Sequence, residues 1–394
     1  MQILGGYVKL NYRNTRRHFK RIAATQIPGK FNSLVVLKNM TTPLPPFSCS
    51  HSPNIPELLY SLQCSVAVTT YQAGKVIFIS APTPTKLVQL PRTFEKPMGL
   101  ALDKDRLAVA TRDQVIVFRN AANMAANYPP HPHTYDALFL PRAAYYTGEI
   151  DIHDIFWSND KLLAVNTRFS CLASIDDTFC FKPEWKPYFV HKITPDDHCH
   201  FNGVAIDGAE PLYATALGDT SGTESWREKK LTGGAVIDIK KNIVLTRGLP
   251  MPHSPRLYNG KLYALLSATG ELVEIDRITG KPAVIKNFNG FVRGMDCIGD
   301  YLFIGLSKLR ESSSAFRDLP IAKQSLFAGI VVMHLPTATI TGFIKYENSV
   351  EEIYDVKILP DVRRPNILSP DKPERKMAVT TPDDDYWAIT KEDQ

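Results

Sequence analysis

The chain has 394 residues, of which 44% are hydrophobic and 22% charged, and its mean hydropathy is -0.15. This balance is typical of a soluble globular protein and excludes disordered and collagen-like classes. It also excludes a membrane-spanning class, because no apolar stretch approaches the roughly 18 residues that a transmembrane helix needs. The net charge of +6 resides in the first 56 residues, which contain eight Lys and Arg and no Asp or Glu, whereas the remainder has 38 basic and 40 acidic residues. We therefore expect no nucleic-acid binding by the folded part and no membrane span.

The basic arm over residues 1–51 allows three interpretations. Arg16 and Arg17 resemble the pair in a twin-arginine export signal, but the apolar run behind them, residues 33–37, is shorter than the roughly 7 to 15 residues such signals need. An acid-free arm also fits an organellar transit peptide or a solvated extension. The six cysteines form no Cys-x-x-Cys pair, which favours a reducing compartment. We expect cytoplasmic localisation, or organellar localisation if the arm is a transit peptide.

Five segments share one repeat, in which a short strand, a polar turn and a second apolar strand follow one another. The copies begin 40 to 55 residues apart, close to the about 40 to 50 residues of a four-stranded propeller blade. Asn, Asp and Gly in the turns accept the positive φ of tight hairpins. The pattern predicts an all-β propeller. The copies begin at Met98, His153, Asn202, His253 and Arg293.

The number of blades depends on the two ends of the repeat region. Residues 65–70, 75–80 and 86–90 look like the second, third and fourth strands of a blade, but a short capped helix at residues 52–62 precedes them. The missing inner strand can come from the lone strand at residues 353–359. We expect that this strand closes a ring of six blades, with seven blades as the alternative.

These boundaries divide the chain into a basic arm (1–51), a propeller (52–360) and a loosely attached or disordered tail (361–394). Two insertions, residues 121–147 and 309–325, interrupt the blades. Long loops on one face of a rigid scaffold are candidates for a lid over a pocket.

The first residue of each repeat should point toward the central channel, because the inner strand of a propeller blade starts at one mouth of that channel. Imidazoles that converge from separate blades suit one divalent Zn, Fe or Cu ion, which accepts neutral nitrogen ligands. We predict that His153, His200 and His253 bind it, with His198 as a substitute or fourth ligand. The alternative is a set of hydrogen-bonded channel histidines without a metal. The six positions around the ring hold Tyr354, Met98, His153, Asn202, His253 and Arg293.

Arg293 differs in chemistry from its neighbours in this ring. A guanidinium at the channel mouth suits a carboxylate or phosphate held through two hydrogen bonds, which predicts an anionic substrate. The alternative is a structural salt bridge to Glu351, Glu352 or Asp296.

Five further assignments complete the predicted site. Asn202, Arg256 and Arg310 are candidates for substrate binding, and Tyr354 or Tyr146 for transferring a proton or polarising a carbonyl. No P-loop, Gly-x-Gly-x-x-Gly turn or Gly-x-Ser-x-Gly elbow occurs, so nucleotide use and serine hydrolysis have no support.

Five runs of sequence carry a family resemblance, namely residues 146–155, 200–203, 251–256, 305–312 and 350–356. They resemble an uncharacterised, mainly bacterial β-propeller family known only as a domain of unknown function. The resemblance covers roughly Phe47 to Pro365, excludes the basic arm and implies no established activity. By architecture alone, six blades with His, Arg and Tyr around the axis are also similar to peptidylglycine amidating lyase, a zinc propeller enzyme. That similarity implies a style of reaction and assigns no residue.

Two functions from different classes follow. The first is a metal-dependent enzyme of lyase, hydrolase or oxygenase type that acts on a small or peptidic, anionic substrate in the axial pocket, where the metal is a Lewis acid or activates water. The second is a non-enzymatic propeller that binds a small ligand or a partner protein through the same face.

Overall fold

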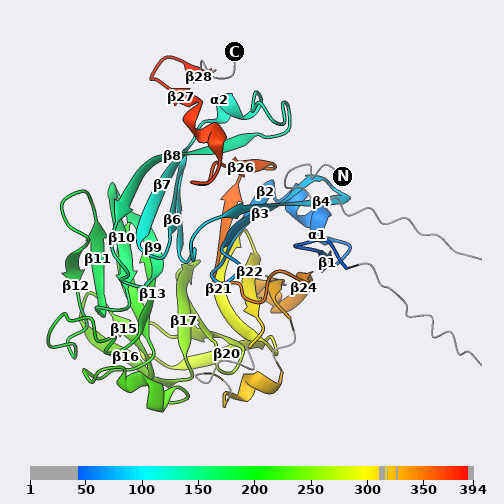
Figure 1. Cartoon of the computed structure of the whole chain (residues 1–394). Coiled ribbons are helices and arrows are strands. Elements are labelled where there is room, and N and C mark those ends of the chain that lie inside the picture. Colours follow the sequence, from blue (N-terminus) through cyan, green and yellow to red (C-terminus); the bar gives the residue numbers. More distant parts are fainter. Residues whose placement is uncertain (1–42, 310–315, 317, 325–326, 389–394) are drawn as a thin grey trace, which may run out of the picture.

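The computed structural model describes residues 43–309, 316, 318–324 and 327–388. Its main body consists of six antiparallel sheets arranged as the blades of a propeller (Figure 1). The inner strands of successive blades contact one another around the ring, and the last contacts the first again. The all-β six-bladed propeller predicted from the repeats is therefore confirmed, and the seven-blade alternative is wrong.

Each blade has four strands, ordered from the channel outward. Blade 1 comprises β25 (Asp355–Pro360), β2 (Cys64–Thr70), β3 (Lys75–Thr83) and β4 (Lys86–Thr93). Blade 2 comprises β5 (Leu100–Asp103), β6 (Arg106–Ala110), β7 (Gln114–Asn120) and β8 (Ala137–Tyr146). Blade 3 comprises β9 (Ile152–Ser158), β10 (Lys161–Asn166), β11 (Cys171–Ile175) and β12 (Lys182–Trp185).

The second half of the ring repeats this order. Blade 4 comprises β13 (Phe201–Asp207), β14 (Glu210–Ala216), β15 (Gly234–Asp238) and β16 (Ile243–Leu249). Blade 5 comprises β17 (Pro252–Tyr258), β18 (Lys261–Leu266), β19 (Glu271–Ile275) and β20 (Pro282–Asn287). Blade 6 comprises β21 (Phe291–Ile298), β22 (Tyr301–Ser307), β23 (Gly329–His334) and β24 (Thr339–Tyr346).

Helices are short and lie outside the sheets. The expected helix before β2 is α1 (Ile55–Ser61), with a proline in its first turn, and its Ile55 and Leu59 are fully buried. No helix in the described ranges is long and apolar enough to cross a membrane. The others are α2 (Ala122–Ala125) and the 3-10 turns η1 (Ser225–Lys229), η2 (Pro320–Lys323), η3 (Leu335–Thr337) and η4 (Pro373–Lys376).

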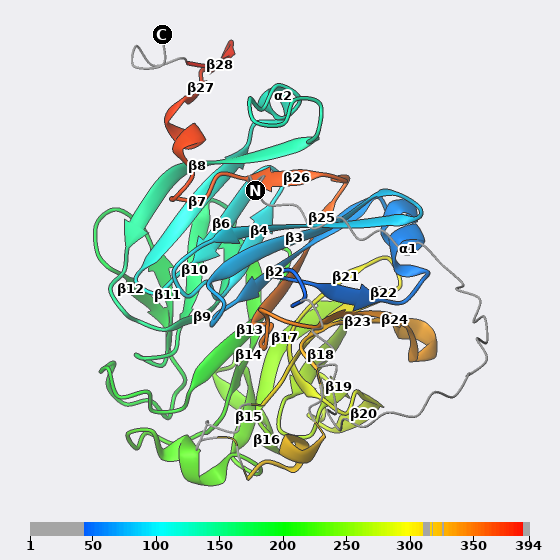
Figure 2. The ribbon, with the colours of Figure 1, turned by 45° about the vertical axis from the view of Figure 1, so that its right-hand side comes forward.

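The ring closes with a strand from the end of the repeat region. β25 pairs antiparallel with β2, with Asp355 opposite Thr69 and Pro360 opposite Cys64. In Figure 2 this orange part of the chain runs beside the blue strands of blade 1. The predicted closure is thus confirmed.

Apolar side chains between adjacent blades build the core. Between blades 1 and 2, the rings of Phe78 and Phe139 have their centroids 6.0 Å apart, and so do those of Phe94 and Phe118. Such face-to-face packing buries both sides of every blade, which explains why the inner strands are apolar almost throughout. The core therefore lies around the channel as a ring, and the channel itself can hold polar side chains.

Segments on both sides of the repeats add strands to the outer edges. β1 (Cys49–His51) extends blade 6 beside β24, and β26 (Pro365–Ile367) runs parallel to β8 at the edge of blade 2. Ile367 and Leu368 are fully buried, so a loosely attached tail is the wrong description for residues 365–368. Farther along, β27 (Ala378–Thr380) and β28 (Asp385–Trp387) form a small hairpin.

The first insertion does not cover the channel mouth. Its second half is β8 itself, and its first half packs against the C-terminal hairpin, with the Tyr128 and Trp387 ring centroids 5.7 Å apart. The expectation that residues 121–147 form a lid is therefore wrong. In the second insertion, residues 310–315, 317 and 325 lie outside the described residues.

Candidate functional site

Four of the residues predicted at the channel mouth lie together. His153, on β9, has its ring centroid 5.6 Å from that of Tyr354, which directly precedes β25. The guanidinium carbon of Arg293, on β21, lies 3.5 Å from the centroid of the Tyr354 ring. The ring centroid of His200, directly before β13, is 4.7 Å from that of His153. The mouth thus joins side chains from blades 1, 3 and 6 with the loop that leads into blade 4.

The hydrogen bonds of His153 fix which ring nitrogen carries the proton. Its Nδ1 lies 2.7 Å from Thr167 Oγ1 and 3.3 Å from the Asp151 carbonyl oxygen. The Thr167 hydroxyl donates its only proton to the Phe201 carbonyl, 2.6 Å away. The hydroxyl oxygen must therefore accept from His153, so Nδ1 carries the proton. Nε2 makes no hydrogen bond to any described residue.

His253, on β17 two blades farther round, repeats this arrangement. Its Nδ1 lies 2.9 Å from Ser267 Oγ and 3.1 Å from the Met251 carbonyl oxygen. The Ser267 hydroxyl donates to the Val292 carbonyl at 2.7 Å, so it too must accept from the imidazole. The proton of His253 is therefore also on Nδ1.

His200 is held by a carboxylate. Its Nδ1 donates to Asp197 Oδ2 at 2.9 Å, and the same oxygen accepts the indole N–H of Trp226 at 3.1 Å. The Trp226 ring also packs on the imidazole, with centroids 4.3 Å apart. The backbone of His200 has a φ of 49°, in the left-handed region that non-glycine residues rarely adopt. Local strain is thus stored where this imidazole is aimed into the mouth.

Burial keeps two of the three imidazoles neutral. It lowers the pKa of His153 well below the usual range, and the neighbouring His200 and Arg293 lower it further. Burial, Arg293 and His200 have the same effect on the pKa of His253. At neutral pH both rings therefore have a proton on Nδ1 and a lone pair on Nε2.

This protonation pattern is what a metal ligand needs. Histidines that bind metals donate their other ring N–H to a carboxylate, carbonyl or hydroxyl, which fixes the orientation of the ring. His153, His200 and His253 all meet this condition, so their donor chemistry fits a borderline divalent ion. Within the described ranges, however, no three His, Cys, Asp or Glu side chains are already arranged as a group that could hold a metal.

Tyr354 and Arg293 form a stacked pair beside the histidines. Burial raises the pKa of Tyr354 well above its usual range, although the positive charge of Arg293 opposes this. Arg293 also lies 3.8 Å from Glu352, so one of the salt bridges considered from the sequence is present at long range. The Tyr354 hydroxyl and Arg293 Nη2 are buried without a hydrogen-bond partner among the described residues. Their hydrogen-bonding capacity is thus unused within the described part of the chain.

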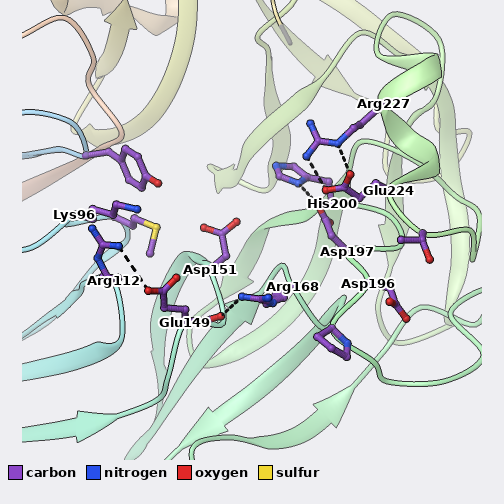
Figure 3. Close-up of a pocket in the computed structure, with 14 residues that line it drawn as sticks. Lys96, Arg112, Glu149, Asp151, Arg168, Asp196, Asp197, His200, Glu224 and Arg227 are labelled. Atoms are coloured by element: carbon purple, nitrogen blue, oxygen red, sulfur yellow. Dashed lines mark hydrogen bonds and ion pairs between the residues drawn. The ribbon is translucent and has the colours of Figure 1, made fainter. Parts of the chain in front are cut away.

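Two cavities open at this mouth and meet at His200. The outer cavity, of about 470 Å³, has mostly charged walls, and Figure 3 shows Asp151 between Lys96 on one side and His200 on the other. Burial raises the pKa of Asp151 above its usual range, although His200, Arg293 and Lys96 act against it. The inner cavity, of about 150 Å³, is lined by His200, His253, Arg293 and several apolar side chains.

A family profile matches residues 53–368, described as a domain of unknown function (DUF4915). The chain belongs to this family. The match confirms the family resemblance derived from the five sequence runs. No curated protein matches the chain.

Two solved structures are similar to this chain at low identity. A chain in the crystal structure of a nidogen/laminin complex is 9% identical, with 76% of this chain and 99% of that chain covered and a TM-score of 0.45. A protein of unknown function from Bacteroides caccae is 10% identical, with 75% and 98% covered and a TM-score of 0.46. Neither similarity bears on the function of the DUF4915 chain.

Arg256 and Asn202 are engaged with the protein. Arg256 lies in the channel on β17, where its Nη1 is 2.8 Å from Asp154 and its Nη2 is 3.9 Å from Asp355. Asn202 donates to the Pro252 carbonyl at 3.0 Å and accepts from Thr215 at 2.7 Å. Neither side chain lines the two cavities, so the structure places both substrate-binding candidates in contacts between blades.

The remaining predicted residues lie elsewhere. Tyr146 ends the outermost strand of blade 2, with 71% of its surface exposed, and it lines neither cavity. His198 is buried, and its Nε2 lies 3.0 Å from Thr194 Oγ1, whereas no contact with the other three histidines is present in the described ranges. Arg310 lies outside the described residues.

Sequence reasoning missed the cavity walls and the hydroxyls behind the histidines. Lys96, Asp151 and Arg168 come from connections between strands, where the repeat gives no register. Thr167 and Ser267 had a visible signal, because both are the last residue of the repeat, fourteen positions after the histidine they contact.

Proposed function

We propose that this DUF4915 protein is an enzyme that acts on a small polar molecule in the axial mouth, with one divalent transition metal bound by His153, His200 and His253. One observation carries the proposal: three imidazoles from three consecutive blades all use Nδ1 to contact the protein and leave Nε2 without a partner among the described residues. Nothing in the packing of a propeller requires this repeated arrangement.

The chemistry expected from such a metal is that of a Lewis acid or an activator of water, and redox chemistry is open if the ion is iron or copper. The chain's own groups supply the rest. Because its pKa is raised, Tyr354 keeps its proton at neutral pH and can donate it, or a hydrogen bond, to a developing negative charge. Arg293 presents a buried N–H that can hold an acidic group of the substrate.

Metal analysis tests this proposal directly. Protein purified without an affinity tag is incubated with Zn²⁺, Fe²⁺ or Cu²⁺, dialysed and analysed by mass spectrometry for bound metal. We expect about one ion per chain for one of these metals, and a loss of most of it in His153→Ala and in His253→Ala.

His198→Ala is the matched control, because His198 is also buried but does not contact the other three histidines. It should keep its metal. Far less than one ion per chain in the wild type, or an equal loss in the control, contradicts the proposal.

A ligand-binding propeller without catalysis is the second candidate, and the outer cavity favours it. Several of its charges already form pairs within the protein, for example Arg227 with Glu224 at 2.7 Å, so the walls are arranged before any ligand binds. This candidate predicts that a ligand binds equally well to the wild type and to a His153→Gln/His253→Gln double variant. It also predicts that both proteins release the ligand chemically unaltered. Turnover by the wild type alone would contradict it.

A further inference from the structure

The two cavities at the mouth differ in chemistry although they share His200. The outer cavity is lined by charged residues of blades 2, 3 and 4, of the connections between them and of the connection from blade 1 to blade 2 (Figure 3). The inner cavity lies toward blades 5 and 6, and its walls include Leu217, Met251 and Phe291. A molecule that fills both must therefore combine a charged part with an apolar part.

Four charged residues of the outer cavity are already paired within the protein. Arg227 forms two hydrogen bonds with Glu224, and Arg112 lies 2.6 Å from Glu95 and 3.6 Å from Glu149. These pairs form parts of the wall that a ligand need not compensate.

Two cations of the outer cavity have no such partner. Lys96 lies over the Tyr71 ring at 5.4 Å, and the one hydrogen bond that the Arg168 side chain makes within the described ranges goes to the Glu149 carbonyl oxygen, at 3.1 Å. Neither has a carboxylate within ion-pair distance among the described residues. Both line the cavity, so a ligand anion can supply the missing partner.

The acidic side chains of the same wall restrict the charge of that anion. Asp151, Asp196 and Asp197 also line the outer cavity, and Asp151 lies centrally in it. A dianionic phosphate would be repelled by these carboxylates more strongly than a single carboxylate would. The walls therefore favour a monoanion.

The inner cavity selects by size and polarity. Met251 and Phe291 belong to an apolar cluster with Leu217 and Trp226, and the volume of about 150 Å³ admits only a compact group. Arg293 also lines this space, and its Nη2 is buried without a hydrogen-bond partner in the described part of the chain, so the inner cavity tolerates a polar atom beside the apolar group but does not require one.

We propose that the ligand is an amphiphilic monocarboxylic acid: its carboxylate is bound by Lys96 and Arg168, and its compact aliphatic or aromatic group occupies the inner cavity. This inference rests on the proposed function in one respect: the molecule that spans the two cavities and passes His200 is assumed to be the substrate. The ligand class itself follows from the cavity walls alone.

Matched pairs of small molecules test the ligand class. Binding of phenylacetate and hexanoate to the full-length protein is measured by titration calorimetry against their neutral amides, against acetate and against phenyl phosphate. We expect each apolar acid to bind about tenfold more tightly than its amide, since one charge-assisted contact is lost, and more tightly than acetate or phenyl phosphate.

Variants connect this preference to the two cations. Lys96→Gln and Arg168→Gln should each lower the affinity for the acids about tenfold and leave the affinity for the amides unchanged. Arg119→Gln is the control, because Arg119 is an exposed residue of blade 2 that lines neither cavity. If no acid binds better than its amide in the wild type, or if the preference survives loss of both cations, the inference is overturned.

His153→Gln separates this inference from the proposed function. If the proposed function is right, this variant loses metal and turnover. If the ligand class is right, it keeps the preference for acids over amides. A wild type that binds no metal but discriminates acid from amide would reject the proposed function and retain the ligand class, whereas a metal-binding wild type without that discrimination would do the reverse.

Discussion

The odd-numbered and even-numbered blades differ at the second position of the repeat. Blades 1, 3 and 5 have Asp355, Asp154 and Ser254 there, and each side chain accepts a main-chain N–H of the next blade: Leu100, Val204 and Gly294, at 2.9, 3.4 and 3.0 Å. Blades 2, 4 and 6 have Gly99, Gly203 and Gly294, where an added Cβ would come within 3.0, 2.5 and 2.7 Å of the following blade. The ring is therefore built from three blade pairs. Within a pair, a side chain of the odd blade contacts the backbone of the even blade, and between pairs the backbone of the even blade closely approaches the next odd blade.

The odd blades carry three of the side chains at the mouth, His153, His253 and Tyr354, whereas Arg293 stands on blade 6 and His200 leads into blade 4. Each odd blade also has a hydroxyl that donates to a carbonyl of the next blade, from Thr69 to Met98, from Thr167 to Phe201 and from Ser267 to Val292. Blade 6 makes the same kind of contact, from Ser307 to Ile353. In blades 3 and 5 that hydroxyl also accepts from the histidine. The contact that joins a blade pair thus also orients the imidazole.

Arg256→Met should have the largest effect on stability. Arg256 connects the three odd blades, because it starts on blade 5 and reaches Asp154 of blade 3 and Asp355 of blade 1. Its removal leaves the buried Asp154 carboxylate without its paired cation and Asp355 with less positive charge nearby, which should cost about 3 to 5 kcal/mol in the free energy of unfolding, measured in urea.

The control is Arg119→Met, which breaks an ion pair of Arg119 with Asp105 that is about half exposed. It should cost less than about 1 kcal/mol. Equal losses in the two variants would show that the odd blades are not tied through Arg256.

Gly294→Ala should be next in size and tests an even blade. A Cβ there would lie 2.7 Å from the Asp355 Cα, and the φ of +72° is unfavourable for alanine. Since the contact is with backbone, we expect a loss of about 3 kcal/mol in thermal or urea unfolding.

Gly299→Ala, in the same blade, provides the comparison. Its φ is +56°, but an added Cβ would meet nothing within 4 Å. It should lose only about 1 kcal/mol through backbone strain. Similar losses at both positions would mean that the close approach between blades 6 and 1 adds nothing.

Thr167→Val should lower stability by about 1 to 2 kcal/mol, because it leaves the His153 Nδ1 proton and the Phe201 carbonyl without their partner. It should also weaken metal binding about tenfold or more, since the ring loses its orientation. Competition with a chelator measures the second effect.

Thr111→Val removes the corresponding hydroxyl of an even blade, which donates to the Gln114 carbonyl of its own blade. Stability should fall there too, but metal affinity should stay at the wild-type value. A weaker metal affinity in Thr111→Val would end the distinction between odd and even blades.

The smallest expected effect is a dependence of stability on pH through His253. Its pKa is lowered in the folded protein, so below its ordinary pKa of about 6.5 the unfolded chain takes up a proton that the folded protein does not. The stabilisation is complete above that pH and is lost as the pH falls, by up to about 1.4 kcal/mol per pH unit.

His253→Gln should therefore show a shallower decline in unfolding free energy than the metal-free wild type between about pH 7 and pH 5. His191→Gln, at an exposed position, should decline as the wild type does. An unchanged slope in His253→Gln would show that another group causes the decline.

Features repeated along the chain could be predicted, because each copy confirms the others. The turn positions are an example: Lys104, Asn159, Asn259 and Gly299 all adopt positive φ at the predicted hairpins. The closing strand was predictable because a blade lacked its inner strand and one strand was left over. The mouth positions of His153, His253 and Arg293 followed from the same register.

Features without a signal in the repeat could not be predicted in this way. Arg256 reaches the channel because the register between β17 and β18 shifts after His253, with Ser254 at a φ of 49°. Such a bulge changes which way the following side chains point, and the repeat gives no sign of it. Lys96 and Arg168 lie in connections whose course depends on the finished ring, so their proximity is a tertiary property.

The pairing of β25 with β2 sets the order in which the molecule can become complete during synthesis. Asp355 bonds to Thr69, a partner made 286 residues earlier, so β2 leaves the ribosome long before its neighbour exists. Until then β2 is an open sheet edge, the kind of surface that recruits strands from other chains. The histidines of blades 3 and 5 are translated in this interval, but Tyr354 and Asp355 arrive only with the final strand. The mouth can therefore acquire its full set of side chains only at the moment the ring closes, which ties function to the last step of folding.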